Sequence, residues 1–155
     1  MKQYSYATIL QKITRKDMSE LIRFGVSLDK NLLDKFDNFI KERSYTNRSE
    51  AFRDLIRQEL IRKEWREDKE VAGAIILIYD HHKRELLNKI TDIQHDFQKL
   101  IISTQHIHLD HNNCLEIIAV KGRAGELQKL SEMLRSLKGV KHGVLSMSST
   151  GENIS

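Results

Sequence analysis

The sequence contains no proline, a single cysteine and only seven glycines among its 155 residues. Because Cys114 is alone, it cannot form a disulfide within the chain, which excludes a disulfide-stapled secreted domain and favours a reducing compartment. No apolar run approaches the roughly 20 residues of a membrane-spanning helix, and no secretory signal is evident at the N-terminus. We therefore expect a cytoplasmic protein without a membrane partner.

Histidine is absent from the first half of the chain. All seven histidines, like Cys114, lie in the second half, between His81 and His142. The net charge of +4 and the pI of about 9.2 are compatible with binding to nucleic acid but also occur in ordinary basic proteins. A chain of this length can form two small domains. The uneven distribution of histidine predicts that two such units have different tasks.

The N-terminal part begins with residues 1–20, which show no clean period and carry scattered charges, and we interpret this segment as an arm. Beyond it, Phe24, Val26 and Leu28 alternate with polar or small residues, which is the period of a strand with one buried face. A lone strand of this kind needs a partner. Its outward-facing residues are Arg23, Gly25 and Ser27.

Two helices are predicted after this strand. Asp29 is suited to cap the first helix, because the apolar residues that follow it recur at helical spacing. Asn47 followed by Glu50 resembles a capping box and begins the second helix, which we expect to end near Asp68.

A strand and two helices within residues 21–67 cannot bury a sufficient core alone, so we expect a dimer in which the strands of two chains pair into a ribbon. A two-stranded ribbon fits the major groove, where Arg23 can donate two hydrogen bonds to guanine and Ser27 can contact a base or a phosphate. Gly25 has no side chain, so recognition of the bases at this position must depend on the neighbouring residues. The start of the second helix can hold a phosphate with backbone N–H groups, at Asn47, Arg48 and Ser49.

The C-terminal part has a different pattern, in which strands and amphipathic helices follow the order β-α-β-β-α-β of the ferredoxin-like or ACT-type fold. We expect strands at 71–79, 100–109, 114–121 and 140–147, and helices at 86–97 and 127–137, the second stopped by Gly139. This domain spans residues 71–148, and residues 149–155 form a polar tail that we expect to be disordered. The predicted fold class of the whole chain is α+β.

The sharpest chemical signal is the set of His106, His108 and Cys114. Residues i and i+2 of a strand share a face, so the two histidines project together. A five-residue hairpin loop, Leu109–Asn113, places Cys114 opposite His108 on the next strand. Imidazoles and a thiolate suit Ni(II) or Cu(II) in a plane and Zn(II) in a tetrahedron. The alternative is that surface histidines and a buried cysteine never share an ion.

The apolar pattern of the two hairpin strands predicts which face of the sheet these ligands occupy. The expected helix-facing set is Ile107, Leu109, Leu115, Ile117 and Ala119. The two histidines, Cys114 and Glu116 would then share the uncovered face. The same assignment leaves an apolar patch on that face, typical of a subunit interface, made of Ile76, Ile78, Ile118 and Val120.

His95 is a candidate fourth ligand on the first helix of this domain. It lies well outside the apolar stripe of that helix and is expected to point away from its own sheet. His95 of one subunit could therefore complete the site of another. His81 and His82 are expected to open the same helix after Asp80, as either a polar helix start or a secondary metal site.

Several segments resemble known families. Arg23–Asp29 and Tyr45–Asp54 resemble ribbon-helix-helix repressors. The similarity to the nickel-responsive regulator family, NikR, lies in Ile78–Glu85, His106–His108, Cys114–Ile117 and Lys138–His142. Together the segments run from about Arg23 to Met147, nearly the whole chain, and the combination is specific because either half alone is shared with other families.

The resemblance implies a homotetramer, a dimer of dimers, with a ribbon-helix-helix dimer at each end of a core of ACT-type domains, bound to double-stranded operator DNA. It also implies one square-planar Ni(II) per subunit, with His106, His108 and Cys114 of one subunit and His95 of another as ligands. Glu50 and Asp54 match the family's second cation site at the junction of the domains, although first-turn carboxylates are also favoured by the helix dipole alone.

This chain departs from the family pattern in two places. Gly25 stands where the family often has a hydroxyl residue, and the arm of residues 1–20 extends beyond the family core and could modulate DNA affinity.

The resulting hypothesis is a repressor of nickel-handling genes, in which nickel favours the arrangement of two ribbon dimers that spans two operator half-sites. A nickel storage or delivery protein would keep the metal site without the DNA function. An enzyme is disfavoured, because four protein ligands leave no easy substrate position in a square plane and no general-base constellation is evident beside them. The remaining alternative is an ACT-type amino-acid sensor in which the histidines are incidental.

Overall fold

The computed structural model describes residues 22–154. The chain divides into two compact units, with the boundary between Arg43 and Ser44. Each unit is described by itself below. Among the described residues, no helix combines the length and the apolar character that crossing a membrane requires.

The described part of the first unit holds one helix, α2 (Lys30–Glu42). Asp29 caps it as expected, since its side chain accepts a hydrogen bond from the Leu32 N–H at 2.9 Å. The strand predicted before it is not formed in the single chain, where residues 22–29 have no regular secondary structure. The prediction placed its pairing strand on a second chain, and a strand ladder cannot form without that partner.

The second unit begins with helix α3 (Arg48–Arg66). Asn47 is its N-cap, and its Oδ1 accepts from the Glu50 N–H at 2.9 Å, which confirms the predicted start. The helix ends where Asp68 takes a left-handed backbone conformation (φ 52°). The carboxylate of Asp68 accepts from the Gly125 N–H at 2.8 Å and from Arg123 Nε at 3.0 Å, so the end of α3 is tied to the start of α5.

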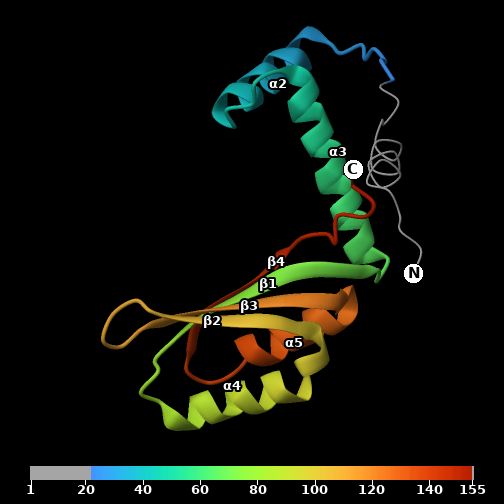
Figure 1. Ribbon diagram of the computed structural model, residues 1–155. Helices are drawn as coiled ribbons and strands as arrows, with labels where there is room; N and C mark the ends of the chain where they lie inside the picture. The colour runs from blue at the N-terminus through green and yellow to red at the C-terminus, as the bar shows by residue number, and fades with distance from the viewer. Residues whose placement is uncertain (1–21, 155) are drawn as a thin grey trace, which may run out of the picture. The chain divides into compact units, whose positions relative to one another are not determined.

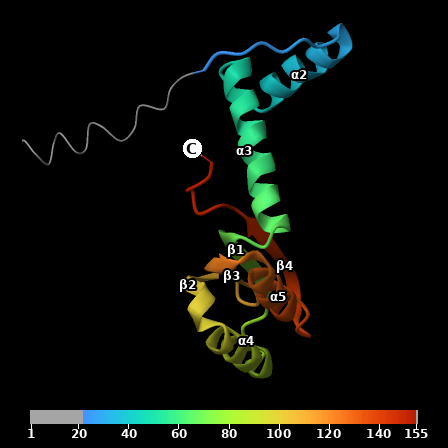
Figure 2. The ribbon, with the colours of Figure 1, turned by 90° about the vertical axis from the view of Figure 1, so that its right-hand side faces the viewer.

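The rest of the second unit is a four-stranded antiparallel sheet with two helices. The strands are β1 (Glu70–Tyr79), β2 (Ile101–His108), β3 (Cys114–Arg123) and β4 (Val140–Met147), in the order β2-β3-β1-β4. The helices are α4 (Arg84–Asp96), followed by a short 3-10 turn η1 (Gln98–Leu100), and α5 (Ala124–Arg135). Figures 1 and 2 show both helices on the same side of the sheet. The β-α-β-β-α-β order confirms the predicted ferredoxin-like arrangement.

The core lies between the sheet and these two helices, and it reverses the face assignment made from the sequence. On β3 the buried residues are Cys114, Glu116, Ile118 and Val120, whereas Leu115, Ile117 and Ala119 are half-buried on the other face. Ile118 and Val120 belong to the core cluster with helix residues such as Leu127. The prediction was wrong because both faces of β3 carry apolar residues, so the choice of Leu115, Ile117 and Ala119 as the helix-facing set had no firm basis in the pattern.

The face of the sheet that the helices leave uncovered is apolar, as predicted, but part of the set of residues that form it differs from the prediction. Ile76 and Ile78 of β1 lie there as predicted, opposite Ile117 and Leu115 of β3 respectively. Ile118 and Val120, which were predicted on this face, are buried beneath the helices instead.

Two boundaries differ from the sequence prediction. Helix α4 begins at Arg84, so His81 and His82 lie in a turn before it and do not open it. Helix α5 ends at Arg135, and Gly139 supplies a positive φ of 113° in the turn that leads into β4.

The C-terminal segment after β4, residues 148–154, is folded against α3, and the prediction of a disordered tail is wrong for these residues. The Ser148 N–H donates to the Ala72 carbonyl at 2.9 Å, and the Ser148 carbonyl accepts from Trp65 Nε1 at 2.8 Å. Arg57 Nε donates to the Ile154 carbonyl at 3.1 Å. Figure 1 shows this segment, coloured red, beside α3.

Candidate metal centre

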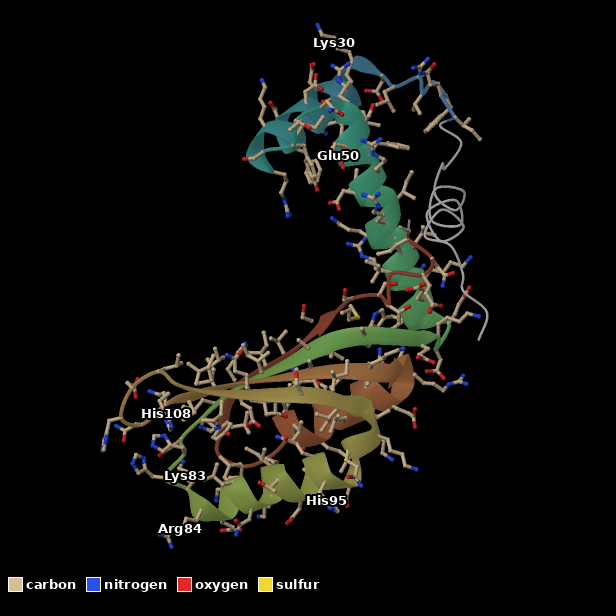
Figure 3. All side chains as sticks on the ribbon, in the orientation of Figure 1. Lys30, Glu50, Lys83, Arg84, His95 and His108 are labelled. Carbon is tan, nitrogen blue, oxygen red and sulfur yellow. The ribbon has the colours of Figure 1, made fainter. Side chains whose placement is uncertain are left out.

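The candidate centre lies at the end of the sheet where β1 finishes and the β2–β3 hairpin turns. Cys114 is paired with His108 on one side and with Tyr79 on the other, so the predicted cross-strand position of His108 and Cys114 is confirmed. The turn of residues 80–83 leaves β1 at the same end, and Figure 3 shows Lys83 and Arg84 close to the His108 end of the domain.

Three imidazole rings surround the buried thiol of Cys114. The Cys114 Sγ lies 3.0 Å from His106 Nε2, 3.2 Å from His108 Nδ1 and 3.2 Å from His81 Nδ1. Nitrogen and sulfur ligands that sit about 2.1 and 2.3 Å from a common ion are about 3 to 3.6 Å apart. Each imidazole nitrogen is therefore spaced from the thiol as a neighbouring ligand of one soft or borderline metal ion would be. Among the described residues, the set around the thiol whose donor atoms also lie within 4.8 Å of one another is His81, His108 and Cys114, and His106 is not part of it.

The proximity of His81 was not expected from the sequence, which ranked it with His82 as a secondary ligand. His81, His108 and Cys114 have donor atoms that all lie within 4.8 Å of one another. The signal was available in the fold: Tyr79 pairs with Cys114, so the residues just after Tyr79 must lie near the thiol. The sequence argument placed these residues in a helix and missed the contact.

Burial sets the protonation of the thiol and of His81. The pKa of Cys114 is raised, first by desolvation and then by the carboxylates of Glu116, Asp110 and Asp80. Desolvation is also the main reason that the pKa of His81 is lowered, with neighbouring His82 and His108 adding to it. At neutral pH the metal-free site therefore has a protonated thiol and a neutral His81, and a metal that binds the thiolate must displace a proton.

A hydrogen-bonded chain of polar groups supports His106 from inside the core. The Tyr79 hydroxyl donates to Glu116 Oε2 at 2.6 Å and lies 3.3 Å from His106 Nδ1. Burial and Glu116 raise the pKa of Tyr79, so the phenol stays protonated. Because its proton goes to Glu116, its oxygen accepts from His106 Nδ1, which favours the tautomer whose Nε2 lone pair faces Cys114. Gln94 Nε2 of α4 donates to Glu116 Oε1 at 2.7 Å.

His82 and His95 do not join this cluster. His82 Nδ1 lies 3.2 Å from Asp80 Oδ1, and Asp80, His81 and His82 form a second group of possible ligands beside the first. His95 is exposed near the C-terminal end of α4, about three helical turns or roughly 16 Å beyond the start of the helix. Figure 3 shows it far along α4 from His108.

Comparison with known proteins identifies the family. The family model for the NikR C terminal nickel binding domain matches residues 72–148, and the model for ribbon-helix-helix proteins of the copG family matches residues 22–63. A nickel-responsive regulator of Syntrophus aciditrophicus is 68% identical over 87% of this chain and 98% of its own length. A regulator of the same name from Chlorobium phaeobacteroides is 64% identical over 85% of this chain and 98% of its own length. Another, from Nitratidesulfovibrio vulgaris, is 52% identical over 88% of this chain and 99% of its own length.

This chain belongs to the NikR family. The family and the observed sheet confirm the predicted fold class, α+β with a ribbon-helix-helix part and a ferredoxin-like part. The family also makes the chain a nickel-responsive transcription regulator, with a DNA-binding and a nickel-binding part, and not an enzyme.

In this NikR chain the residues predicted to contact DNA are exposed. Arg23, Gly25 and Ser27 all lie in the segment of residues 22–29, and a Cβ at Gly25 would have nothing within 4 Å. At the start of α3, Arg48 and Ser49 are exposed. The Asn47 side chain caps the helix, because its Oδ1 accepts a hydrogen bond from the Glu50 N–H.

The carboxylates of the predicted second cation site already have protein partners in the NikR chain. Glu50 forms an ion pair with Arg53 on the next turn of α3. Asp54 accepts hydrogen bonds from the Tyr45 hydroxyl and, at 2.7 Å, from Gln58 Nε2. A cation at this site would have to compete with these contacts.

Proposed function

We propose that this NikR protein is a repressor in which Ni(II), bound between subunits, promotes operator binding. The observation that carries the proposal is the buried Cys114 thiol with imidazole nitrogens at 3.0–3.2 Å. The ligands would be His106, His108 and Cys114 of one subunit and His95 of another. Bound Ni(II) would act as a structural tie between them, with one ion per subunit.

The position of His95 supports a ligand from a second subunit, for a different reason from the one argued from the sequence. The other three proposed ligands lie on the side of the sheet that α4 covers, so they are not on the opposite face from His95. The distance along α4 keeps His95 away from them, since His95 is about three turns from the end of the helix that lies near the cluster. An exposed ligand that cannot reach its own site is available to a neighbour's site.

The apolar uncovered face of the sheet supports assembly into a homotetramer. Cross-strand pairs of Ile76 with Ile117 and of Ile78 with Leu115 form a continuous apolar surface in the middle of the sheet. Surfaces of this kind are usually interfaces. We propose that this face joins two ACT-type domains, residues 71–148, while the ribbon-helix-helix domains, residues 21–67, pair separately into a dimer of dimers.

DNA contact in the proposal comes from the paired ribbon and the helix start. Arg23 and Ser27 would read the major groove, with Gly25 between them, and Asn47, Arg48 and Ser49 would lie against the phosphate backbone. Because operator DNA is the partner, a cytoplasmic location belongs to the same proposal.

Two secondary cation sites also belong to the proposal. One is the group of Asp80, His81 and His82, whose donors lie beside the nickel ligands. The other is Glu50 with Asp54, one turn apart on α3, where a cation would replace the present contacts to Arg53 and Gln58.

Nickel can act as a switch only if it binds the DNA-competent arrangement more tightly than the other. The test is a mobility-shift assay on operator DNA selected from a random pool, with and without Ni(II), using wild type, Cys114→Ala and the exposed-histidine control His142→Ala. We expect nickel-dependent binding for wild type and the control, and none for Cys114→Ala. Nickel-independent binding that Cys114→Ala leaves unchanged would contradict the switch. Nickel binding without any DNA binding would indicate storage or delivery.

A further inference from the structure

A group of oxygen-bearing side chains lies away from the candidate nickel centre, where the C-terminal segment folds against α3. The last turns of α3, the start of β1 and the C-terminal segment enclose a cavity of about 550 Å³. Four carboxylates line it together with a hydroxyl, an amide and two ammonium groups, namely Glu64, Glu67, Glu70, Glu152, Thr150, Asn153, Lys63 and Lys69. None of these side chains carries nitrogen or sulfur of the kind that surrounds Cys114.

Glu64 is the unusual member of this lining because it is a carboxylate with only 8% of its surface exposed. Its Oε1 accepts a hydrogen bond from Asn153 Nδ2 at 3.1 Å. Its Oε2 is buried and has no hydrogen-bond partner. A buried carboxylate oxygen without a partner is costly, and a cation in the cavity would remove that cost.

Nearby lysines are engaged with the other carboxylates. The ammonium groups of Lys63 and Lys69 lie 3.8 and 4.0 Å from the carboxylate of Glu67. Lys121 lies 2.9 Å from Glu70, which is the main reason that its pKa is raised, and Glu152 adds to that effect. Glu67 and Glu70 are thus balanced by ammonium groups. Among the described residues, the two lining carboxylates without an ion pair within 4.0 Å are Glu64 and Glu152.

We propose that Glu64, with Glu152 and oxygen atoms of Asn153 and Thr150, binds a hard divalent cation such as Ca²⁺, Mg²⁺ or Mn²⁺. Carboxylate, amide and hydroxyl oxygens are the ligands these ions prefer, whereas imidazole and thiolate suit nickel. The ion links α3 to the C-terminal segment and so holds that segment on the helix. This site is separate from Glu50 and Asp54, since Glu64 lies about four turns, or roughly 21 Å, further along α3 than Glu50.

Trp65 provides a built-in reporter of this site. It is the only tryptophan of the chain, it follows Glu64 directly, and its indole N–H donates to the Ser148 carbonyl at the start of the C-terminal segment. A cation that holds the segment in place changes the surroundings of the indole, and paramagnetic Mn²⁺ quenches its emission.

The experiment titrates the full-length protein, with its nickel sites filled first, with Mn²⁺ and in parallel with Ca²⁺. Trp65 emission and electron paramagnetic resonance of free Mn²⁺ are both recorded. We expect saturable binding of one ion per chain that perturbs Trp65, weakened at least tenfold in Glu64→Gln. Glu67→Gln, on the same cavity but paired with lysines, is the matched control and should bind like wild type. Unchanged circular dichroism and nickel binding would show that each variant is folded.

Several results would overturn this proposal. One is the absence of saturable binding in wild type, and another is Glu64→Gln binding Mn²⁺ as tightly as wild type. A third is loss of the Trp65 response in Asp54→Asn but not in Glu64→Gln, which would assign the ion to the other end of α3. None of these results bears on the nickel site, so they leave the proposed function intact.

Discussion

The two units of this chain differ in how much apolar surface each covers by itself. In the first unit, Ile22 is 77% exposed and Val26 57% exposed. In the second, Leu77 and Leu127 are fully buried between sheet and helices. The second unit therefore builds a core from one chain, whereas the described N-terminal segment leaves apolar residues exposed. In the proposed dimer a second chain covers these residues, so the second unit would supply stability and the first unit the specificity of pairing.

The largest expected effect is on the core of the second unit. Leu127→Ala should lower its free energy of unfolding by about 2–5 kcal/mol, because the substitution leaves a cavity under the sheet. Denaturant unfolding followed by circular dichroism measures the loss. Leu109→Ala, at a half-exposed position of the hairpin, is the control and should cost well under that amount. Equal losses for the two variants would mean that the sheet core is not where stability resides.

In the first unit, a charge on the predicted inner face of the ribbon should separate pairing from stability. Val26→Asp should weaken operator binding at least tenfold, which is about 1.4 kcal/mol, because the carboxylate would be buried in the ribbon. The unfolding of the sheet domain and its nickel binding should stay as in wild type. Fluorescence anisotropy of labelled DNA measures operator binding, and equilibrium dialysis measures nickel binding. Unchanged DNA binding in Val26→Asp would contradict the proposed pairing of two strands into a ribbon.

The polar layer in the core gives a smaller effect on unfolding than the core leucine does. Tyr79→Phe removes the donor to Glu116 Oε2 and leaves that buried oxygen without its 2.6 Å bond. We expect a loss of about 1–3 kcal/mol in unfolding free energy. Tyr79→Phe combined with Glu116→Gln should recover part of the loss, because the neutral amide is less costly to bury. No recovery in the double variant would argue that the two groups are not coupled.

The smallest effect concerns the link between α3 and α5. The Gly125 N–H and then Arg123 lower the pKa of Asp68 below its ordinary value of 3.8. A lowered pKa means that the stabilisation is present above pH 4 and disappears as the pH falls through the pKa of the folded state. Asp68→Asn, which keeps the left-handed backbone accessible, should therefore be slightly less stable than wild type at pH 7, and the difference should shrink as the pH falls below 4. A difference that does not shrink with falling pH would rule out the charge as its cause.

The order of elements and the caps could be predicted because they depend on local chemistry. Asp29 and Asn47 mark helix starts by their side-chain acceptors, and the loop length sets His108 opposite Cys114. The buried face of β3 could not be predicted in the same way. Both of its faces are apolar, and burial of Glu116 depends on Tyr79 and Gln94, which come from other elements.

Two parts of the candidate sites were also hidden from the sequence for a tertiary reason. His81 reaches the thiol because β1 lies beside β3, a neighbour relation that no local pattern contains. The C-terminal segment looks disordered by composition, yet Trp65 and Arg57 hold its carbonyls against α3. Polar segments of this kind are ordered by specific partners rather than by their own residues.

The most direct test of a nickel site shared between subunits is complementation of two defective variants. Cys114→Ala keeps His95 but lacks the thiolate, and His95→Ala keeps the cluster but lacks the ligand for its neighbour. Each alone should bind nickel weakly and lack the intense absorption of a complete nickel–thiolate site. After subunit exchange in an equal mixture, we predict that this absorption and tight nickel binding return in part. If the mixture binds no more nickel than its components, or if His95→Ala alone binds like wild type, nickel is not held between subunits.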